Sequence, residues 1–517
     1  MIRDRNMTVL QLIRVGIGLV TFFSVVLELV FFFSIENLCG CVMTIITTWV
    51  FLTFFLHEDI IVDHPFPFLM YLSMFLYHFL PLPCTLLERK PISYGMEMAT
   101  TTFLLETVMF CIGSFAFYLT VRRPLHNRGV TKLLNTFSFF ADYSDTVIIV
   151  VGLIGFIAKI SALIALPIGA LKSVLSGLVG LMYAPILLFF PNLYDSEREM
   201  NLSRPMVWVY TIVVFIMSFG TNSRYALLTP FGIFAILYFL SICKNKMTVE
   251  EIANPKRIIA IVLIVFVGLS VVDKASEAML KVRNIRNDVS FTELLSVTFE
   301  SITELKTEDI VEVFEVKEPS KYVEGWTEEY LDNFMLNRYA NMRISDETLY
   351  LASLLDENEI KVMRKDFYDR IILTFPNPVI KMLGSDLNKD DYKSSRGDLL
   401  NYYAGNGSSY TLGNLIVTSS LADGLIQFGL LYYLLQFFLW HIMFRLLDSM
   451  CYRYNGETFY SLLSLISVFT ILGMYRNANG CLQDISYIIR YFWEDAFLFI
   501  VAFFLARSIV YTFYRKR

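Results

Sequence analysis

The sequence predicts an all-α polytopic membrane protein with about twelve transmembrane helices and one large, mainly helical loop outside the membrane. The first observation is composition. Of the 517 residues, 56% are hydrophobic and only 18% are charged, whereas a soluble domain carries about 25% charged residues. The second observation is where the charge lies: residues 273–420 hold 17 of the 43 Lys and Arg and 26 of the 48 Asp and Glu. The rest of the chain is therefore strongly apolar, as membrane-spanning segments are.

Nine apolar runs precede this polar insert. The first follows a short basic start, and it is too long for the roughly 7–15-residue core of a signal peptide. We therefore expect it to be retained as a transmembrane helix. In order, the nine runs cover residues 15–33, 38–56, 66–80, 98–121, 146–166, 171–190, 205–219, 225–243 and 258–272.

Three further apolar runs follow the insert, at residues 421–446, 459–475 and 496–514. The chain is therefore expected to divide into three parts. They are residues 1–272 with transmembrane helices one to nine, residues 273–420 as the large loop, and residues 421–517 with helices ten to twelve.

The loop has the pattern of helices. Thr327 precedes Glu328 and Glu329, which is the arrangement of an N-cap followed by an acidic first turn. Tyr330 and Phe334 then follow at a four-residue step, on one helix face. We expect a loop built of helices, without a β-sheet.

Basic residues indicate the orientation. With the N-terminus inside the cell, 18 Lys and Arg fall on the cytoplasmic side and 5 in the opposite short loops. This asymmetry agrees with the positive-inside rule. It places both termini in the cytoplasm and the large loop on the other side of the membrane.

Arg224 is the first candidate for the functional site. It stands in a tight outer turn, at the predicted start of the helix that covers residues 225–243. Free backbone amides at a helix N-terminus bind anions, and an arginine there can bind phosphate through two hydrogen bonds. The alternative is an interfacial anchor without a chemical role.

Arg338 and Arg343 form the second candidate, with Tyr339 beside them. Five residues apart, the two arginines do not share one helix face, but a break between them would let both reach one ligand. The alternative is that they pair with the many acids of the insert.

Arg476 and Arg490 bracket the last outer loop. Each of them either binds an anionic substrate or pairs with a neighbouring acid. His78 lies in the outer half of its predicted helix, where it is either hydrogen-bonded structure or a base. Carboxylates near the outer surface are the candidate bases, with Asp346 first. The others are Asp398, Asp423, Asp484 and Glu494.

Metal and nucleotide signals do not appear in the sequence. The seven cysteines are scattered, and Cys39 and Cys41 do not have the spacing of a metal site. No Gly-rich phosphate loop of the GxxxxGK type occurs. Outward-facing arginines in an apolar scaffold instead favour an anionic ligand, such as a lipid-linked phosphate or pyrophosphate.

Several short motifs resemble those of the bacterial O-antigen polymerase family, whose members polymerise oligosaccharide repeat units and are related to O-antigen ligases. The motifs are Asn222-Ser223-Arg224-Tyr225-Ala226-Leu227-Leu228, Asn337-Arg338-Tyr339 with Arg343-Ile344, Phe375-Pro376-Asn377-Pro378, Gly405-Asn406-Gly407, Gly424 and Gly429. The hydrophobic layout, with one large outer loop late in the chain, extends the resemblance over nearly the full length.

The resemblance implies a glycosyltransferase fold of the GT-C type in the bacterial inner membrane, with the active site facing the periplasm. It implies undecaprenyl-pyrophosphate-linked glycans as donor and acceptor, no metal or other cofactor, and no nucleic acid. A chain-length regulator protein is a further candidate partner. Arg224, Arg338, Arg343 and Asp346 are the expected catalytic residues, with Arg476, Arg490, His78 and Tyr339 as substrate contacts.

Two other classes remain open. An O-antigen ligase would pass the chain to a lipid A core, although the outer loops lack the evident histidine of the ligase branch. A flippase or secondary transporter would also use about twelve helices, but such proteins show inverted repeats, and no internal repeat is visible here.

Overall fold

In a computed structural model of the chain, the described residues are 7–122, 126–140, 143–163, 169–219, 224–252, 326, 331–333, 336–337, 342–407, 412–475 and 480–514. These residues are mostly helical. Six helices are long and apolar enough to cross a membrane, and one bent pair makes a seventh if it counts as a single span. The six are Val9–Phe31, Ile35–Phe55, Ala99–Val121, Asp145–Ala162, Ala226–Lys244 and Cys481–Thr512. The predicted all-α membrane class agrees with this, whereas the predicted ninth span, residues 258–272, lies outside the described residues.

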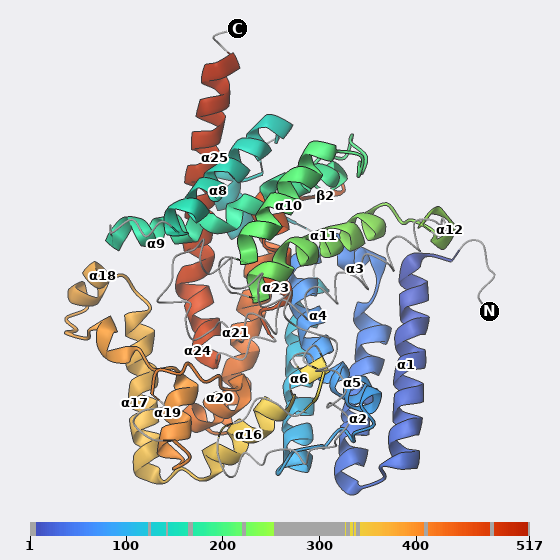
Figure 1. The fold of residues 1–517 in the computed structure, drawn as a ribbon, viewed down its shortest axis with the longest axis vertical. Coiled ribbons are helices and arrows are strands. Elements are labelled where there is room, and N and C mark those ends of the chain that lie inside the picture. Colours follow the sequence, from blue (N-terminus) through green and yellow to red (C-terminus); the bar gives the residue numbers. More distant parts are fainter. Residues whose placement is uncertain are drawn as a thin grey trace, which may run out of the picture.

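The N-terminal helices form an upright bundle (Figure 1). A capping box between Thr8 and Gln11 starts α1 (Val9–Phe31). Ser34 caps α2 (Ile35–Val50), which continues as the π-helical segment η1 (Phe51–Phe55). Large apolar side chains of α1 are exposed along most of its length, which suits a helix in contact with lipid.

Helix α4 (Pro65–Phe79), which follows the short α3 (Glu58–Asp63), lies at the centre of the bundle. Thirteen of its fifteen residues are buried, as expected for a helix surrounded on all sides. Pro81 cannot continue the backbone hydrogen bonding, and α4 meets α5 (Pro81–Leu87) at an angle of 45°. Helix α6 (Ala99–Val121) packs against α2, α4 and α21.

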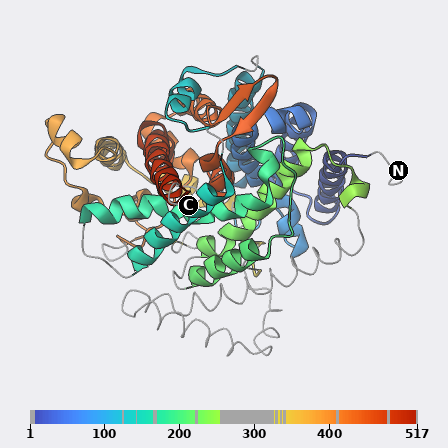
Figure 2. The same ribbon diagram turned by 90° about the horizontal axis from the view of Figure 1, so that it is seen from above.

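Helices α8 to α11 lie across the bundle, so that Figure 2 shows them lengthwise where α1 and α25 are seen end on. Gly155 of α8 lets the following segment approach, because a Cβ there would lie 2.6 Å from the carbonyl carbon of Leu181. The segments of this region are α7 (Gly129–Thr136), α8 (Asp145–Leu163), α9 (Gly169–Leu178), the 3-10 helices η2 (Val179–Phe189) and η3 (Pro191–Leu193), α10 (Pro205–Phe219), α11 (Arg224–Lys244) and α12 (Val249–Ile252).

The described part of the insert gathers at one end of the bundle, beside the α1–α2 turn and the start of α6 (Figure 1). Its regular elements are all helical, as expected for this part of the loop. They are α16 (Met342–Ser353), α17 (Glu357–Leu373), α18 (Asn377–Met382), η7 (Lys389–Tyr392) and α19 (Arg396–Tyr403). Capping boxes at Asp356 and Ser395 start α17 and α19.

The segments after the insert differ from the predicted spans. Predicted span 421–446 is divided into α20 (Ser420–Phe428) and α21 (Leu431–Asp448) at Gly429, whose φ of +55° favours glycine. Predicted span 459–475 begins in a β-hairpin instead. Its strands β1 (Cys451–Tyr454) and β2 (Glu457–Tyr460) are antiparallel, with Cys451 opposite Tyr460.

The last membrane span is longer than the predicted 496–514. Two short helices, α22 (Leu462–Ile466) and α23 (Val468–Leu472), precede it. Helix α24 (Cys481–Ser486), the π-helical segment η9 (Tyr487–Tyr491) and α25 (Phe492–Tyr514) then follow one another. Together they pass as one span candidate that begins at Cys481.

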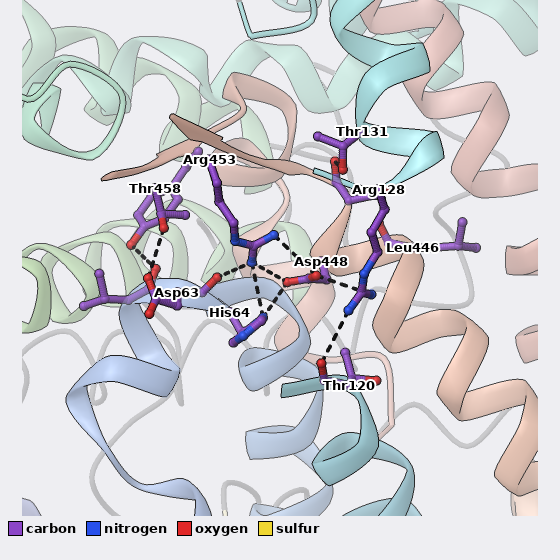
Figure 3. A network of polar contacts seen from close by, with 12 residues as sticks. Asp63, His64, Thr120, Arg128, Thr131, Leu446, Asp448, Arg453 and Thr458 are labelled. Carbon is purple, nitrogen blue, oxygen red and sulfur yellow. Dashed lines mark hydrogen bonds and ion pairs between the residues drawn. The ribbon is translucent and has the colours of Figure 1, made fainter. Parts of the chain in front are cut away.

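A buried polar cluster fixes the β-hairpin to the C-terminal end of α21 (Figure 3). The Asp448 carboxylate accepts hydrogen bonds from His64 Nδ1 at 2.6 Å and Arg453 Nη2 at 2.7 Å. Arg128 lies 3.3 Å from its other oxygen. Because Asp448 is only 1% exposed, these partners provide the charge and hydrogen bonds that a buried carboxylate requires.

Candidate functional site

A small polar cavity lies where the insert meets the membrane helices. Its volume is about 30 Å³, which gives room for a water molecule or two rather than for a sugar ring. The lining residues are Met70, Tyr77, Glu106, Ser345, Ser419, Ser420, Leu421, Trp440, Met474, Tyr475, Gly480, Gln483 and Asp484. Two of these are carboxylates on span candidates, and ionisable groups between membrane helices are by default functional candidates.

Helix α16 brings the insert to this cavity. Asp346 binds the start of α6, where its carboxylate accepts hydrogen bonds from the backbone N–H groups of Glu97 at 2.8 Å and Met98 at 3.1 Å. The Thr102 hydroxyl donates a third, at 2.7 Å. A negative charge at a helix N-terminus also interacts favourably with the helix dipole. Asp346 thus fixes α16 to α6, and this contact holds its neighbour Ser345 over the cavity.

Glu106, in the middle of α6, is the centre of a hydrogen-bond network. Its Oε1 accepts from the Ser345 hydroxyl at 2.6 Å, and the Tyr77 hydroxyl lies 2.6 Å from Ser345 Oγ. Because the Ser345 hydrogen points to Glu106, Tyr77 is the donor to Ser345. The other carboxylate oxygen faces His78 Nε2 at 3.2 Å and accepts from the Tyr475 hydroxyl at 3.4 Å.

The contact between His78 and Glu106 contains a shared proton. His78 Nδ1 lies 2.8 Å from the carbonyl oxygen of Met74, and because a carbonyl only accepts, Nδ1 carries a hydrogen. A neutral imidazole then has no hydrogen on Nε2, and an ionised carboxylate has none to offer. The hydrogen bond between Nε2 and Glu106 therefore requires one proton, held by either partner. His78 and Glu106 are 0% and 2% exposed, so bulk water is excluded from this pair.

Asp484 reaches the cavity from α24. Its Oδ2 accepts from the Gln436 side-chain amide of α21 at 2.5 Å, and the Trp440 side chain, which also lines the cavity, lies close to it. Both partners are neutral, and within the described part of the chain no cationic side chain forms an ion pair with Asp484. The two carboxylates of the cavity therefore differ in kind: Glu106 shares a proton with a histidine, whereas the described donor to Asp484 is neutral.

A buried ion network behind the cavity joins the insert to α20. Arg396 lies 2.7 Å from both Asp423 and Asp366, and Arg370 lies 2.7 Å from Asp366. Burial alone would lower the pKa of the Arg396 guanidinium, but the two carboxylates raise that pKa above its usual value. Asp423 also supports the cavity wall, because a Cβ added at Gly480 would lie 2.5 Å from its Oδ2.

Two of the five predicted arginines have described side chains, and neither lines the cavity. Arg343 of α16 is 2% exposed and lies close enough to Tyr94 to interact with it electrostatically. Arg490 binds Glu494 at 2.7 Å and donates to the carbonyl oxygen of Thr374 at 3.1 Å.

Arg224 is the first residue of α11, the helix-start position that the sequence predicts. Arg338, Tyr339 and Arg476 lie outside the described residues. The convergence of Arg224, Arg338 and Arg343 on one ligand therefore stays a prediction.

Of the five carboxylates that the sequence offers as bases, Asp484 lines the cavity. The other four have structural contacts. Asp346 binds the start of α6, and Asp398 accepts from backbone N–H groups of the loop that follows α19, among them that of residue 416 at 2.9 Å. Asp423 and Glu494 are paired with arginines.

Sequence analysis did not identify Glu106, Ser345 or Tyr77. One signal for Glu106 was available, since it is a lone acid near the middle of the apolar run 98–121, and intramembrane acids are functional candidates. Ser345 and Tyr77 carry no comparable signal, because common residues become significant only through their positions in the fold.

The arrangement suits proton transfer. A proton-holding pair lies on one side of the cavity and a carboxylate with neutral partners on the other, and such differences in environment separate acid and base roles. Among the residues that the structure describes, no group of three or more His, Cys, Asp or Glu is placed to hold a metal ion.

No family model, no curated protein and no solved structure matches the chain.

Proposed function

We propose that the chain is a membrane glycosyltransferase that joins lipid-linked oligosaccharide repeat units into a polysaccharide. The observation that carries this proposal is the cavity that α16 of the insert forms with Glu106 and Asp484 of two span candidates. Transfer of a glycan from a lipid pyrophosphate needs a group that takes a proton from a sugar hydroxyl. A carboxylate between membrane helices, close to an extramembrane insert, suits a substrate whose lipid lies in the membrane and whose glycan lies outside it.

In the proposed reaction, the oxygen of an acceptor hydroxyl attacks the anomeric carbon of the growing chain. The bond from that carbon to the lipid pyrophosphate breaks, and the pyrophosphate leaves with the electron pair. The hydroxyl proton passes to a base of the site. Arg224, Arg338 and Arg343 would stabilise the leaving group through preorganised hydrogen bonds, with Arg476 and Arg490 as further contacts.

The proposal includes the topology that the sequence predicts. About twelve spans, in a GT-C type arrangement, would place both termini in the cytoplasm and the insert in the periplasm of a bacterial inner membrane. Undecaprenyl-pyrophosphate-linked glycans would be donor and acceptor, and a chain-length regulator protein would be a partner. The resemblance to O-antigen polymerases and the basic-residue asymmetry support this part of the proposal.

Substrate binding would require the cavity to open. Its volume of about 30 Å³ accommodates water only. The Thr348 and Ser419 hydroxyls are 2.7 Å apart, so α16 and the start of α20 are joined to each other. We propose that these two helices move together, away from α24, to admit the sugar.

The experiment uses the full chain in lipid nanodiscs with lipid-linked oligosaccharides extracted from cells that lack the gene. The proposal predicts a ladder of products with increasing numbers of repeat units. It also predicts that these cells accumulate single lipid-linked repeats and lose long polysaccharide. Unchanged polysaccharide in the deletion strain, together with an absent ladder in vitro, would refute the proposal. Transfer of one finished chain to lipid A core, without elongation, would indicate a ligase.

A second candidate function is a proton-coupled transporter, which the intramembrane carboxylates and the histidine pair also favour. The bend of 45° between α4 and α5 adds to this, since broken helices line the substrate sites of many transporters. Proteoliposomes distinguish the two candidates. A transporter acidifies or alkalinises the lumen when substrate is added, whereas the glycosyltransferase moves no proton across the membrane and releases lipid pyrophosphate.

A further inference from the structure

We infer that the two carboxylates of the cavity have different roles, in which Asp484 takes the proton of the substrate hydroxyl while Glu106 shares its proton with His78 and holds Ser345 in place at the cavity wall. The inference rests on the proposed function for the identity of the hydroxyl. The assignment of the protons rests on the geometry alone.

The partners of Glu106 make it a poor proton acceptor. Its pair with His78 already holds one proton, because the Met74 carbonyl fixes a hydrogen on His78 Nδ1. A second proton would leave a net positive charge at a site with almost no exposure, and burying an unpaired charge is costly. The Ser345 hydroxyl, which accepts from Tyr77, donates to the other oxygen of this carboxylate and occupies it. Glu106 is therefore a positioning residue.

Asp484 has the opposite environment. Gln436 donates a hydrogen bond to it, and neither Gln436 nor the neighbouring Trp440 carries a charge. Its negative charge has no described counter-charge, so uptake of a proton removes an uncompensated charge from the membrane interior. Asp484 also lines the cavity directly, where a substrate hydroxyl would lie. Asp484 is therefore the catalytic residue that accepts the proton.

The surrounding groups do not change this assignment. Four elements pack against α24: α17, α20, α21 and η9. Of these, α17 and η9 contribute nothing to the cavity lining. Among the residues that the structure describes, the titratable and charged groups around Asp484 are Tyr432 of α21, Asp423 of α20 with its partner Arg396, Cys481 of α24 and, across the cavity, Glu106 with Tyr475.

The step balances without a further reactant. The O–H bond of the acceptor sugar breaks and its proton joins an oxygen of Asp484. The sugar oxygen forms a bond to the anomeric carbon, and the pyrophosphate leaves with the electrons of the bond that breaks. After product release, Asp484 returns the proton to water. Glu106 and His78 keep their shared proton throughout.

Two isosteric variants are expected to lower the transfer rate by very different amounts. Asp484→Asn keeps an oxygen that accepts from Gln436 but cannot take a proton, so the transfer rate falls by about 10²–10⁴-fold. In Glu106→Gln the amide reproduces the proton-bearing form: its oxygen accepts from Ser345 and its N–H donates to His78 Nε2. The rate then falls by no more than roughly tenfold, the scale of one hydrogen bond. Glu106→Ala loses both contacts and falls further.

The matched control is Asp495→Asn, which changes a carboxylate on the same long span outside the cavity lining and should leave the rate unchanged. The pH profile adds a second readout: the wild-type rate falls in acid as Asp484 takes up a proton, and Asp484→Asn lacks this dependence. A nearly normal rate for Asp484→Asn, or a loss in Glu106→Gln as large as in Asp484→Asn, overturns the inference.

Infrared spectroscopy of the purified chain separates this inference from the proposed function, because it needs no substrate. In difference spectra between neutral and mildly acidic pH, we expect one component of the carboxyl C=O band to be lost in Asp484→Asn and kept in Asp495→Asn. Glu106→Gln should leave this band in place. If the band persists in Asp484→Asn, the inference fails even when a product ladder forms. If the band behaves as expected and no ladder forms, the proton assignment stands and the proposed reaction fails.

Discussion

Replacement of Asp346 distinguishes a residue that holds the insert in place from one that takes part in the reaction. Asp346→Ala removes the acceptor of two backbone N–H groups, those of Glu97 and Met98, and of the Thr102 hydroxyl. The hydroxyl can rotate toward another acceptor. The two N–H groups cannot, because the helix that follows them fixes their direction.

The magnitude follows from these contacts. A fully buried N–H that loses its acceptor costs about 1–3 kcal/mol; because these two are only partly buried, the two together cost about 1–3 kcal/mol of folding free energy. Asp346→Asn keeps one acceptor oxygen and should lose about half as much. We therefore expect the order of stability wild type, Asp346→Asn, Asp346→Ala.

Thermal unfolding of the purified protein in nanodiscs measures this order, with product formation recorded on the same samples at low temperature. The midpoint of unfolding should fall in both variants, and the activity that remains should follow the folded fraction. An Asp346→Ala protein that unfolds at the wild-type temperature but makes no product would refute this reasoning and restore Asp346 as the catalytic base.

Three further predictions concern other charged groups. Arg396→Ala leaves a buried carboxylate of α20 without its cation and should destabilise the protein by about 3–5 kcal/mol, measured as the shift of a denaturant transition; a shift below about 1 kcal/mol would mean that the pair contributes little. Asp448→Ala leaves the guanidinium groups of Arg453 and Arg128 without their shared carboxylate, with a loss of up to similar size, and faster protease cleavage in the β-hairpin would report it, whereas an unchanged cleavage rate would contradict the role of this cluster. Arg224→Ala and Arg338→Ala should each reduce long polysaccharide by about 10²–10³-fold, and lysine should not restore it because it lacks the planar fork; normal chain length on gels in both variants would make these arginines structural.

Hydropathy predicted the membrane helices well where one apolar run makes one straight helix, as in α1 and α6. It did not predict the break at Gly429, which depends on local backbone conformation inside an apolar run, or the β-hairpin, which lies mostly between two predicted spans. Asn455 and Gly456 have positive φ values, as a two-residue type I′ turn requires. That turn signal was present in the sequence, in the short segment between the predicted spans 421–446 and 459–475, where no element was predicted.

The candidate site was less predictable than the fold. Positive charge directed attention to the arginines, and His78 was identified as one residue among several. The importance of His78 comes from two contacts, one with the Met74 carbonyl in its own helix and one with Glu106 in another. The first follows from helix geometry, but the second requires the packing of α4 against α6, which a single sequence does not contain.

The attachment of α16 to α6 has a consequence for protein engineering. Because Asp346 binds the start of α6 and Ser345 binds Glu106, the insert is not a module that can be exchanged by itself. In a chimera that takes residues 273–420 from another protein, α6 would lose its N-terminal partner and Glu106 would lose its hydroxyl donor. Successful recombination boundaries should therefore transfer α6 together with the insert, although residues 122–272 separate the two in the sequence.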